Sequence, residues 1–254
     1  MQPPRVTNQK TNRQNPKFGE MDSMKKTARL AGLLYVIMTI QAPIALLYVP
    51  SYIIVKGNTA ATLNNLLAHE FMFRLSIVSQ LASTIIFFLL AFVLYRLFKQ
   101  VNHFQAKLLL AFVLVQVPIT FVFETISFTS LMIAKSEILQ SVATDQKQAL
   151  VTLLLKIHSY GLVTSEIFWG LWLIPFGQLV YKSAFIPRIF GFLLIFGGIC
   201  WIGDSITFLL FPAWHPLVSD IVAKTGWVGE IPIMLWLLIM GVKERSIVTG
   251  RLEP

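Results

Sequence analysis

The sequence predicts an all-α membrane protein, a polytopic transmembrane helix bundle with six spans. Its composition is the first reason: 56% of the 254 residues are hydrophobic and 13% are charged, whereas about 25% of residues are charged in a typical soluble domain. The mean hydropathy of +0.70 agrees with this. The second reason is the number of long apolar stretches. The third is an uneven distribution of Lys and Arg between them.

The predicted spans each contain about the 20 predominantly apolar residues that a membrane helix needs. Pro43, Pro118 and Pro175 interrupt three of them, which lipid-embedded helices tolerate when neighbouring helices satisfy the freed carbonyl groups. Pro187 and Pro232 lie near the starts of their helices, where proline fits well. The six spans are expected at about 28–49, 72–95, 107–134, 157–181, 188–211 and 227–242.

The positions of the basic residues predict the orientation of the bundle. With the N-terminus in the cytoplasm, the segments on that side hold 15 of the 21 Lys and Arg residues. Cytoplasmic loops carry such an excess in membrane proteins. We therefore expect an N-in/C-in orientation. The net charge of +9 is explained by this topology, so the predicted partner is the lipid bilayer and no nucleic acid is expected.

The chain divides into three predicted parts. Residues 1–24 are polar and basic without hydrophobic periodicity, which is typical of a disordered cytoplasmic tail. Residues 25–245 form the six-span membrane domain, and residues 246–254 form a short cytoplasmic tail. No small-residue cleavage motif follows the first span, so we expect it to be a retained helix and not a cleaved signal peptide.

The loops on the outer side are expected to contain short helices. In residues 57–70, Asn58 and Thr59 are candidate N-caps before apolar residues at helical spacing. Residues 144–158 begin with a capping Thr144 and are able to continue into the fourth span, and residues 215–224 form a third candidate. These helices are expected to rest on the membrane interface. The alternative is a lid over an outward-facing cavity.

Four of the twelve acidic residues fall inside the predicted spans. Glu124 and Asp204 lie roughly 24–26 Å from the cytoplasmic edge of a hydrocarbon core about 30 Å thick. Glu166 and Glu230 lie a few residues below the outer edge. All four are thus expected in the outer half, on four different helices. A carboxylate within the bilayer is costly, so these groups should face the bundle interior or a water-filled cavity.

Basic residues and further acids are expected at a similar height. Arg74 begins the second span, Glu70 precedes it by one turn, and His158 lies at the outer rim. Four span carboxylates against one arginine leave excess negative charge, which calls for protonation, a bound cation or a basic ligand. The alternative for each residue is a structural one, an interhelical polar lock or a solvated position at the rim.

No catalytic motif is recognisable. His69 and Glu70 lack the second His of a zincin motif, because Phe73 occupies that position. Gly203-Asp204 lacks the first Gly of the intramembrane aspartyl protease pattern, and no nucleophile elbow or Walker A loop occurs. Cys200 is the single cysteine, so a disulfide framework and a Cys-based metal cluster are excluded. No cofactor is recognised and no metal site is predicted.

Several stretches together resemble a known family. They are KKTARLAGLLYV (25–36), HEFMFRLSIVSQL (69–81), FWGLWLIPFGQLVYKSAFIPRIFGFLL (168–194), IGDS (202–205) and GEIPIMLWLLIMGVK (229–243). The combination resembles a bacterial multi-spanning membrane family, the domain of unknown function 4386. The resemblance implies a multi-pass protein of the bacterial cytoplasmic membrane, and it supplies no activity, substrate or cofactor.

The leading functional hypothesis is a ligand-binding or transport module with an outward-facing polar cavity. Its ligand would be a cation, a proton, or a small amine-bearing or amphipathic molecule. The candidate site residues are the polar groups already described: Glu70, Arg74, Glu124, His158, Glu166, Asp204 and Glu230. Two alternatives stay open, a membrane-embedded hydrolase, with a metal as one variant, and a structural or regulatory membrane subunit.

Overall fold

A computed structural model describes residues 16–43 and 49–242. Over these residues the protein is helical and contains no strand, as the all-α prediction requires. The helices are α1 (Pro16–Pro43), α2 (Val49–Ile53), α3 (Thr59–Ala68), α4 (Glu70–Phe98), α5 (His103–Ala134), α6 (Thr144–Lys182), α7 (Arg188–Leu210), α8 (His215–Thr225), the 3-10 helix η2 (Gly226–Val228) and α9 (Glu230–Ile239).

Five segments of the described chain are long and apolar enough to cross a membrane. Four of them are α4 to α7, which contain the predicted second to fifth spans almost completely. The fifth is the stretch His215–Ile239, in which the predicted last span is divided between η2 and α9. The predicted first span, 28–49, includes residues 44–48, which lie outside the described residues. The count of six spans and the N-in/C-in orientation therefore stay predictions.

Helix α1 starts earlier than the sequence indicated. It begins at Pro16, so residues 16–24 are helical, whereas we expected them to belong to a disordered tail. The reason is that a helix, once formed, extends easily, because each further residue that becomes ordered adds one backbone hydrogen bond. Such an extension does not need an apolar face of its own. The rest of both predicted tails, residues 1–15 and 243–254, lies outside the described residues.

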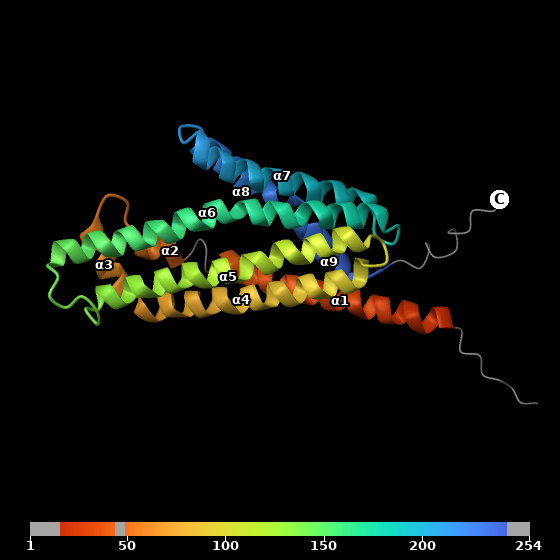
Figure 1. Cartoon of the computed structure of the whole chain (residues 1–254), viewed down its shortest axis with the longest axis horizontal. Coiled ribbons are helices and arrows are strands. Elements are labelled where there is room, and N and C mark those ends of the chain that lie inside the picture. Colours follow the sequence, from red (N-terminus) through yellow and green to blue (C-terminus); the bar gives the residue numbers. More distant parts are fainter. Residues whose placement is uncertain (1–15, 44–48, 243–254) are drawn as a thin grey trace, which may run out of the picture.

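The long helices run along one axis and form an elongated bundle (Figure 1). Helix α6 packs between α5 and α7, and α1 packs against α4 and α9. The α4–α5 and α6–α7 turns lie at one end of the bundle, and α3 lies at the other (Figure 1). The guanidinium of Arg29 in α1 lies 3.5 Å from the carbonyl oxygen of Ile239, so the C-terminal end of α9 lies beside α1.

Two pairs of glycines set the register between α6 and α7. A Cβ atom on Gly191 would lie 2.6 Å from the carbonyl oxygen of Gly177, and a Cβ on Gly198 would lie 2.8 Å from that of Gly170. Such distances are too short for any side chain, so the two backbones are in contact, as small residues permit in membrane helices. The pairing is antiparallel and brings residue 166 of α6 beside residues 202–204 of α7.

The short helices are present at the expected places, and the expected cap is confirmed for one of them and wrong for another. Asn58 caps α3, because its side chain accepts a hydrogen bond of 2.9 Å from the backbone N–H of Ala61. Residues 144–158 continue into the fourth span as the single helix α6. Its N-cap is Ala143 and not Thr144, which is the first helical residue. The candidate at 215–224 is α8.

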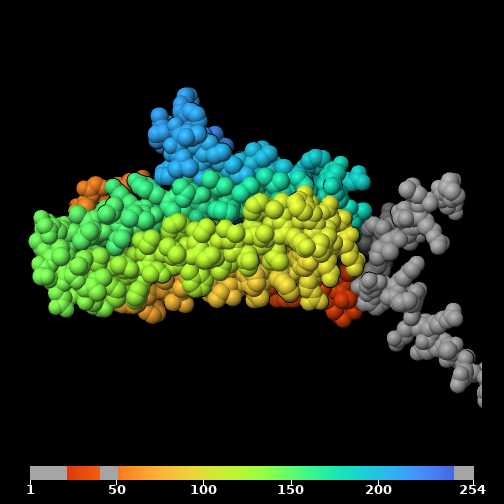
Figure 2. Space-filling model, in the orientation of Figure 1, coloured from red at the N-terminus to blue at the C-terminus, as the bar shows by residue number. Residues whose placement is uncertain are grey.

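The surface of the bundle is rich in exposed apolar side chains. The α7–α8 turn projects from the side of the elongated body (Figure 2) and exposes Leu210, Phe211 and Trp214 by more than half. Exposed leucines, isoleucines and phenylalanines also occur along α4, α5 and α7. A monomeric soluble protein rarely exposes so continuous an apolar surface. Together with the five membrane-compatible helices, this surface indicates a helical protein embedded in a bilayer.

Candidate functional site

The structure distributes the predicted polar residues over four separate groups. The first lies on the surface at the start of α4. The guanidinium of Arg74 contacts the Glu70 carboxylate at 2.7 Å, and the ammonium of Lys135 lies 3.1 Å from the same carboxylate. Lys135 also pairs with Glu137 at 3.0 Å. These two carboxylates, Glu137 first, raise the pKa of the Lys135 side chain above its usual value.

The second group joins α5 to α6. The Nε2 atom of His158 lies 3.1 Å from Oε1 of Glu124. The Glu124 side chain is 6% exposed and that of His158 is 18% exposed. This contact crosses between two adjacent helices and is the geometry of an interhelical polar lock.

The third group joins α6, α7 and α8. Glu166 and Asp204 are 8% and 2% exposed, and the close packing of α6 on α7 brings residue 166 beside residues 202–204. His215 approaches Asp204 from α8, with 3.4 Å between Nε2 and Oδ1. That distance is within the range of an ion pair, although the contact is not a hydrogen bond. Oε2 of Glu166, Oδ1 of Asp204 and Nε2 of His215 therefore lack hydrogen-bond partners.

The fourth group surrounds Glu230 at the start of α9. The hydroxyl of Tyr35 in α1 donates a hydrogen bond of 2.5 Å to Oε2 of Glu230. Trp201 in α7 lines the same cavity as Glu230. Tyr35 and Glu230 are 1% and 7% exposed. Among the described residues, this carboxyl is thus held by a tyrosine hydroxyl and pairs with no basic side chain.

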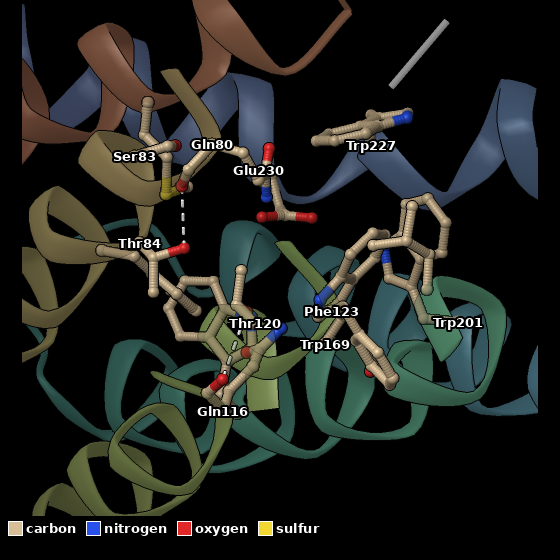
Figure 3. Close-up of a pocket in the computed structure, with 15 residues that line it drawn as sticks. Gln80, Ser83, Thr84, Gln116, Thr120, Phe123, Trp169, Trp201, Trp227 and Glu230 are labelled. Carbon is tan, nitrogen blue, oxygen red and sulfur yellow. Dashed lines mark hydrogen bonds between the residues drawn. The ribbon is translucent and has the colours of Figure 1, made fainter. Parts of the chain in front are cut away.

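Glu230 also lines a partly open cavity of about 110 Å³. Figure 3 shows its carboxyl group between polar side chains of α4 and α5 and a group of tryptophans. The wall includes Gln80, Ser83 and Thr84 from α4, Gln116, Thr120 and Phe123 from α5, Trp169 and Trp172 from α6, Trp201 from α7, and Trp227 from η2. Of the seven predicted site residues, Glu230 alone is among the residues that line this cavity.

The cavity wall combines aromatic surface with a few polar atoms. Trp201 lies edge-to-face against Trp169 and against Trp227, with ring centroids 5.5 Å and 5.4 Å apart. The Thr84 and Thr120 hydroxyls donate to backbone carbonyls of their own helices. Oε1 of Gln116, on a side chain 6% exposed, has no hydrogen-bond partner. None of the lining residues is basic, so the one charged group that the cavity presents is the Glu230 carboxyl, beside neutral polar groups and π faces.

The described residues contain no group of three His, Cys, Asp or Glu side chains arranged to hold a metal ion. His158 faces a single carboxylate, and Glu166, Asp204 and His215 do not converge on a common point. The hypothesis of a metal-assisted hydrolase therefore gains no support from the geometry of these residues.

Comparison with known proteins places the chain in a family. Residues 30–241 match the model of a family described as Domain of unknown function (DUF4386). The chain belongs to this family. The resemblance inferred from the sequence is thus confirmed, and the match runs from the middle of α1 to the end of α9. No curated protein and no solved structure matches the chain, so DUF4386 membership brings no activity with it.

Sequence reasoning missed three partners in this DUF4386 protein. Tyr35 lies in the predicted first span and carries no charge that would single it out. His215 was assigned to a short helix in a loop without a role. The tryptophans belong to the predicted apolar spans or their ends. Three of the six in the chain, Trp169, Trp172 and Trp201, nevertheless occur at helical spacing from each other or from Asp204. That aromatic density was the available signal.

The surface group gives a prediction for this DUF4386 protein. Exposed ion pairs contribute little to stability because water screens both charges. We therefore expect Glu70→Gln to leave the melting temperature unchanged, although it removes the partner of Arg74. Thermal unfolding in detergent, followed by circular dichroism, measures this effect. A loss as large as that caused by replacing a buried carboxyl would show that Glu70 belongs to the interior network.

Proposed function

We propose that the cavity beside Glu230 binds a small organic amine in its cationic form. On this proposal the protein is a ligand-binding or transport module of the bacterial cytoplasmic membrane. The observation that carries the proposal is a buried carboxyl group in a cavity with several tryptophans and no basic residue. A ligand that carries a positive charge supplies the cationic partner of Glu230 that the cavity wall lacks.

The tryptophans favour a cation over a neutral ligand. The face of an indole ring attracts a positive charge through its quadrupole, and the attraction grows when water is excluded. Trp169, Trp172, Trp201 and Trp227 all line the cavity. An ammonium group placed beside the Glu230 carboxyl would therefore contact both an anion and π surface. Aromatic cages of this kind are a recognised way of binding amines.

The size and polarity of the wall limit the ligand. A cavity of about 110 Å³ is smaller than the engineered cavity of about 150 Å³ that binds benzene, so a short alkylamine is the appropriate class. The unpartnered Oε1 of Gln116 is available as an acceptor for an ammonium N–H. The remaining apolar surface would contact the alkyl group, as in most small-molecule sites.

The arrangement of the chain supports the proposed orientation. The α4–α5 and α6–α7 turns lie at one end of the bundle (Figure 1), and α9 ends there beside α1. These are the segments that hold the excess of Lys and Arg. The positive-inside rule then favours the cytoplasm for this end, and the outer side for α3 and the start of α6.

Amine binding is testable with the tryptophans as reporters. Purified protein in lipid nanodiscs is titrated with isobutylamine and with isobutanol, its neutral isostere, while tryptophan fluorescence is recorded. We expect a saturable change with the amine and a response at least tenfold weaker with the alcohol. Glu230→Gln should weaken amine binding at least tenfold, about 1.4 kcal/mol, and should leave the response to the alcohol unchanged.

Two controls separate binding from general effects. Empty nanodiscs with free tryptophan report partition of the amine into lipid. Glu137→Gln removes an exposed carboxyl outside the cavity and should bind the amine like the wild type. Equal affinity for amine and alcohol, or amine affinity that survives in Glu230→Gln, would contradict the proposal. A purely structural role predicts that Glu230→Gln lowers the melting temperature and that no saturable binding occurs.

A further inference from the structure

The group formed by Glu166, Asp204 and His215 lies outside the cavity and has no role in amine binding. It differs from the other buried acids because its polar atoms lack partners. Glu124 has His158 at 3.1 Å, and Glu230 has Tyr35. By contrast, one oxygen of Glu166 and one oxygen of Asp204 are buried without a hydrogen bond.

The register of α6 and α7 brings the two carboxyl groups together. The glycine contacts pair residue 170 with 198 and residue 177 with 191. If the same antiparallel pairing continues along the two helices, residue 166 meets residues 202–204. The hydroxyl of Ser205, which lies 3.4 Å from the carbonyl oxygen of Thr164, extends this register by another step. The pair of acids is thus a consequence of close helix packing.

Buried polar atoms in native proteins nearly always have a partner, so an orphaned pair calls for a missing one. Two adjacent carboxylates repel each other, and burial makes this repulsion stronger. Among the described residues, no Lys or Arg forms an ion pair with either acid. A proton between the two oxygens satisfies both, since one carboxyl then donates to the other.

A proton fits this group better than a metal ion. The described residues offer no set of three side chains arranged around a metal, whereas a proton needs two oxygens only. His215 adds a route to the outside. Its side chain is 20% exposed, while that of Asp204 is 3% exposed, and Nε2 lies 3.4 Å from Oδ1. An imidazole nitrogen beside a carboxyl oxygen is able to accept a proton from it and to return one.

We propose that Glu166 and Asp204 form a proton-binding site, in which they share one exchangeable proton, and that His215 is the group through which this proton exchanges with solvent. In the exchange, the shared proton passes from a carboxyl oxygen to Nε2 of the neutral imidazole. The imidazolium returns it to the carboxyl pair or loses a proton from Nδ1 to water. The site is independent of the Glu230 cavity and holds whether or not an amine binds there.

The other ionisable groups on the surrounding helices have their own partners or lie apart. Glu124 and His158 are paired between α5 and α6. Asp220 and Lys224 of α8 pair with each other at 2.6 Å on the surface. Tyr160 of α6 and His215 each pack against the Phe208 ring, with ring centroids 5.4 Å and 5.0 Å away. This aromatic contact helps to hold the imidazole beside Asp204.

Infrared spectroscopy detects a shared proton directly, because a protonated carboxyl has a C=O stretching band that a carboxylate lacks. We expect the wild type near neutral pH to show such a band and to shift it in deuterated water. Glu166→Gln and Asp204→Asn should each lose one carboxyl band. The double variant should lose no more than either single variant, since the two acids hold one proton between them.

Matched variants complete the test. His215→Gln should keep the band and slow its shift in deuterated water. Asp220→Asn, on the same helix as His215, should match the wild type in both respects. Circular dichroism confirms that each variant is folded, and the wild-type spectrum alone tests the proposal if a variant fails to fold. Absence of an exchangeable band in the wild type would overturn it, as would loss of two bands in the double variant.

Discussion

Replacing Gly198 by leucine is expected to lower the free energy of unfolding by about 3 kcal/mol. A Cβ at this position would lie 2.8 Å from the carbonyl oxygen of Gly170 and 3.2 Å from the Cβ of Leu173. The first of these atoms belongs to the backbone and cannot rotate away. The two helices would have to separate, and α6–α7 is the most extensive helix pair of the bundle. Unfolding in detergent, followed by circular dichroism, measures the loss.

Gly203→Leu is the matched control, because it lies on the same helix. No atom lies within 4 Å of a Cβ built on Gly203. Leucine also has a higher helix propensity than glycine, by about 0.8 kcal/mol, so this variant should be as stable as the wild type or slightly more stable. If both variants lost equal stability, close packing of α6 on α7 would not be the cause.

His158→Leu is expected to cost about 3 kcal/mol, because it leaves the buried Glu124 carboxyl without a partner. Glu124 is 5% exposed, and His158 supplies its hydrogen bond. Adding Glu124→Leu to the same protein should restore most of the lost stability, since an apolar pair then replaces a polar one. The measurement is the unfolding free energy of the two single variants, the double variant and the wild type.

His158→Gln is the control for this prediction. The glutamine side chain is able to donate a hydrogen bond to Glu124, so it should lose much less stability than leucine. Additive effects of the two leucine substitutions would contradict the lock, because independent sites add and coupled sites do not. A lock between α5 and α6 and an amine site at Glu230 are compatible, since they use different residues.

The acidic residues show how far sequence reasoning reached in the candidate site. The cost of placing a carboxylate in lipid implied that Glu124, Glu166, Asp204 and Glu230 face the interior, and all four are buried. The expectation of one shared cavity does not describe their arrangement, because each group has different neighbours. Height along a helix follows from the sequence at a known rise per residue. Rotation about the helix axis, which decides what each side chain meets, does not.

The sequence by itself determined the class of this protein. Length and hydropathy of the spans are properties of the chain, and lipid admits few structures other than helices at these positions. Family membership also follows from the sequence, over residues 30–241. The start of α1 did not follow from the sequence, because a helix extends by propagation through residues that carry no apolar signal.

Only the tertiary structure decided which polar groups meet. Tyr35 and Glu230 are far apart in the chain and form a hydrogen bond across α1 and α9, and His215 reaches Asp204 from a short helix beyond the span. The glycine contacts between α6 and α7 fix the register that puts Glu166 beside Asp204. Such pairings depend on helix rotation and on the closeness of two backbones, which arise only when all the helices pack together.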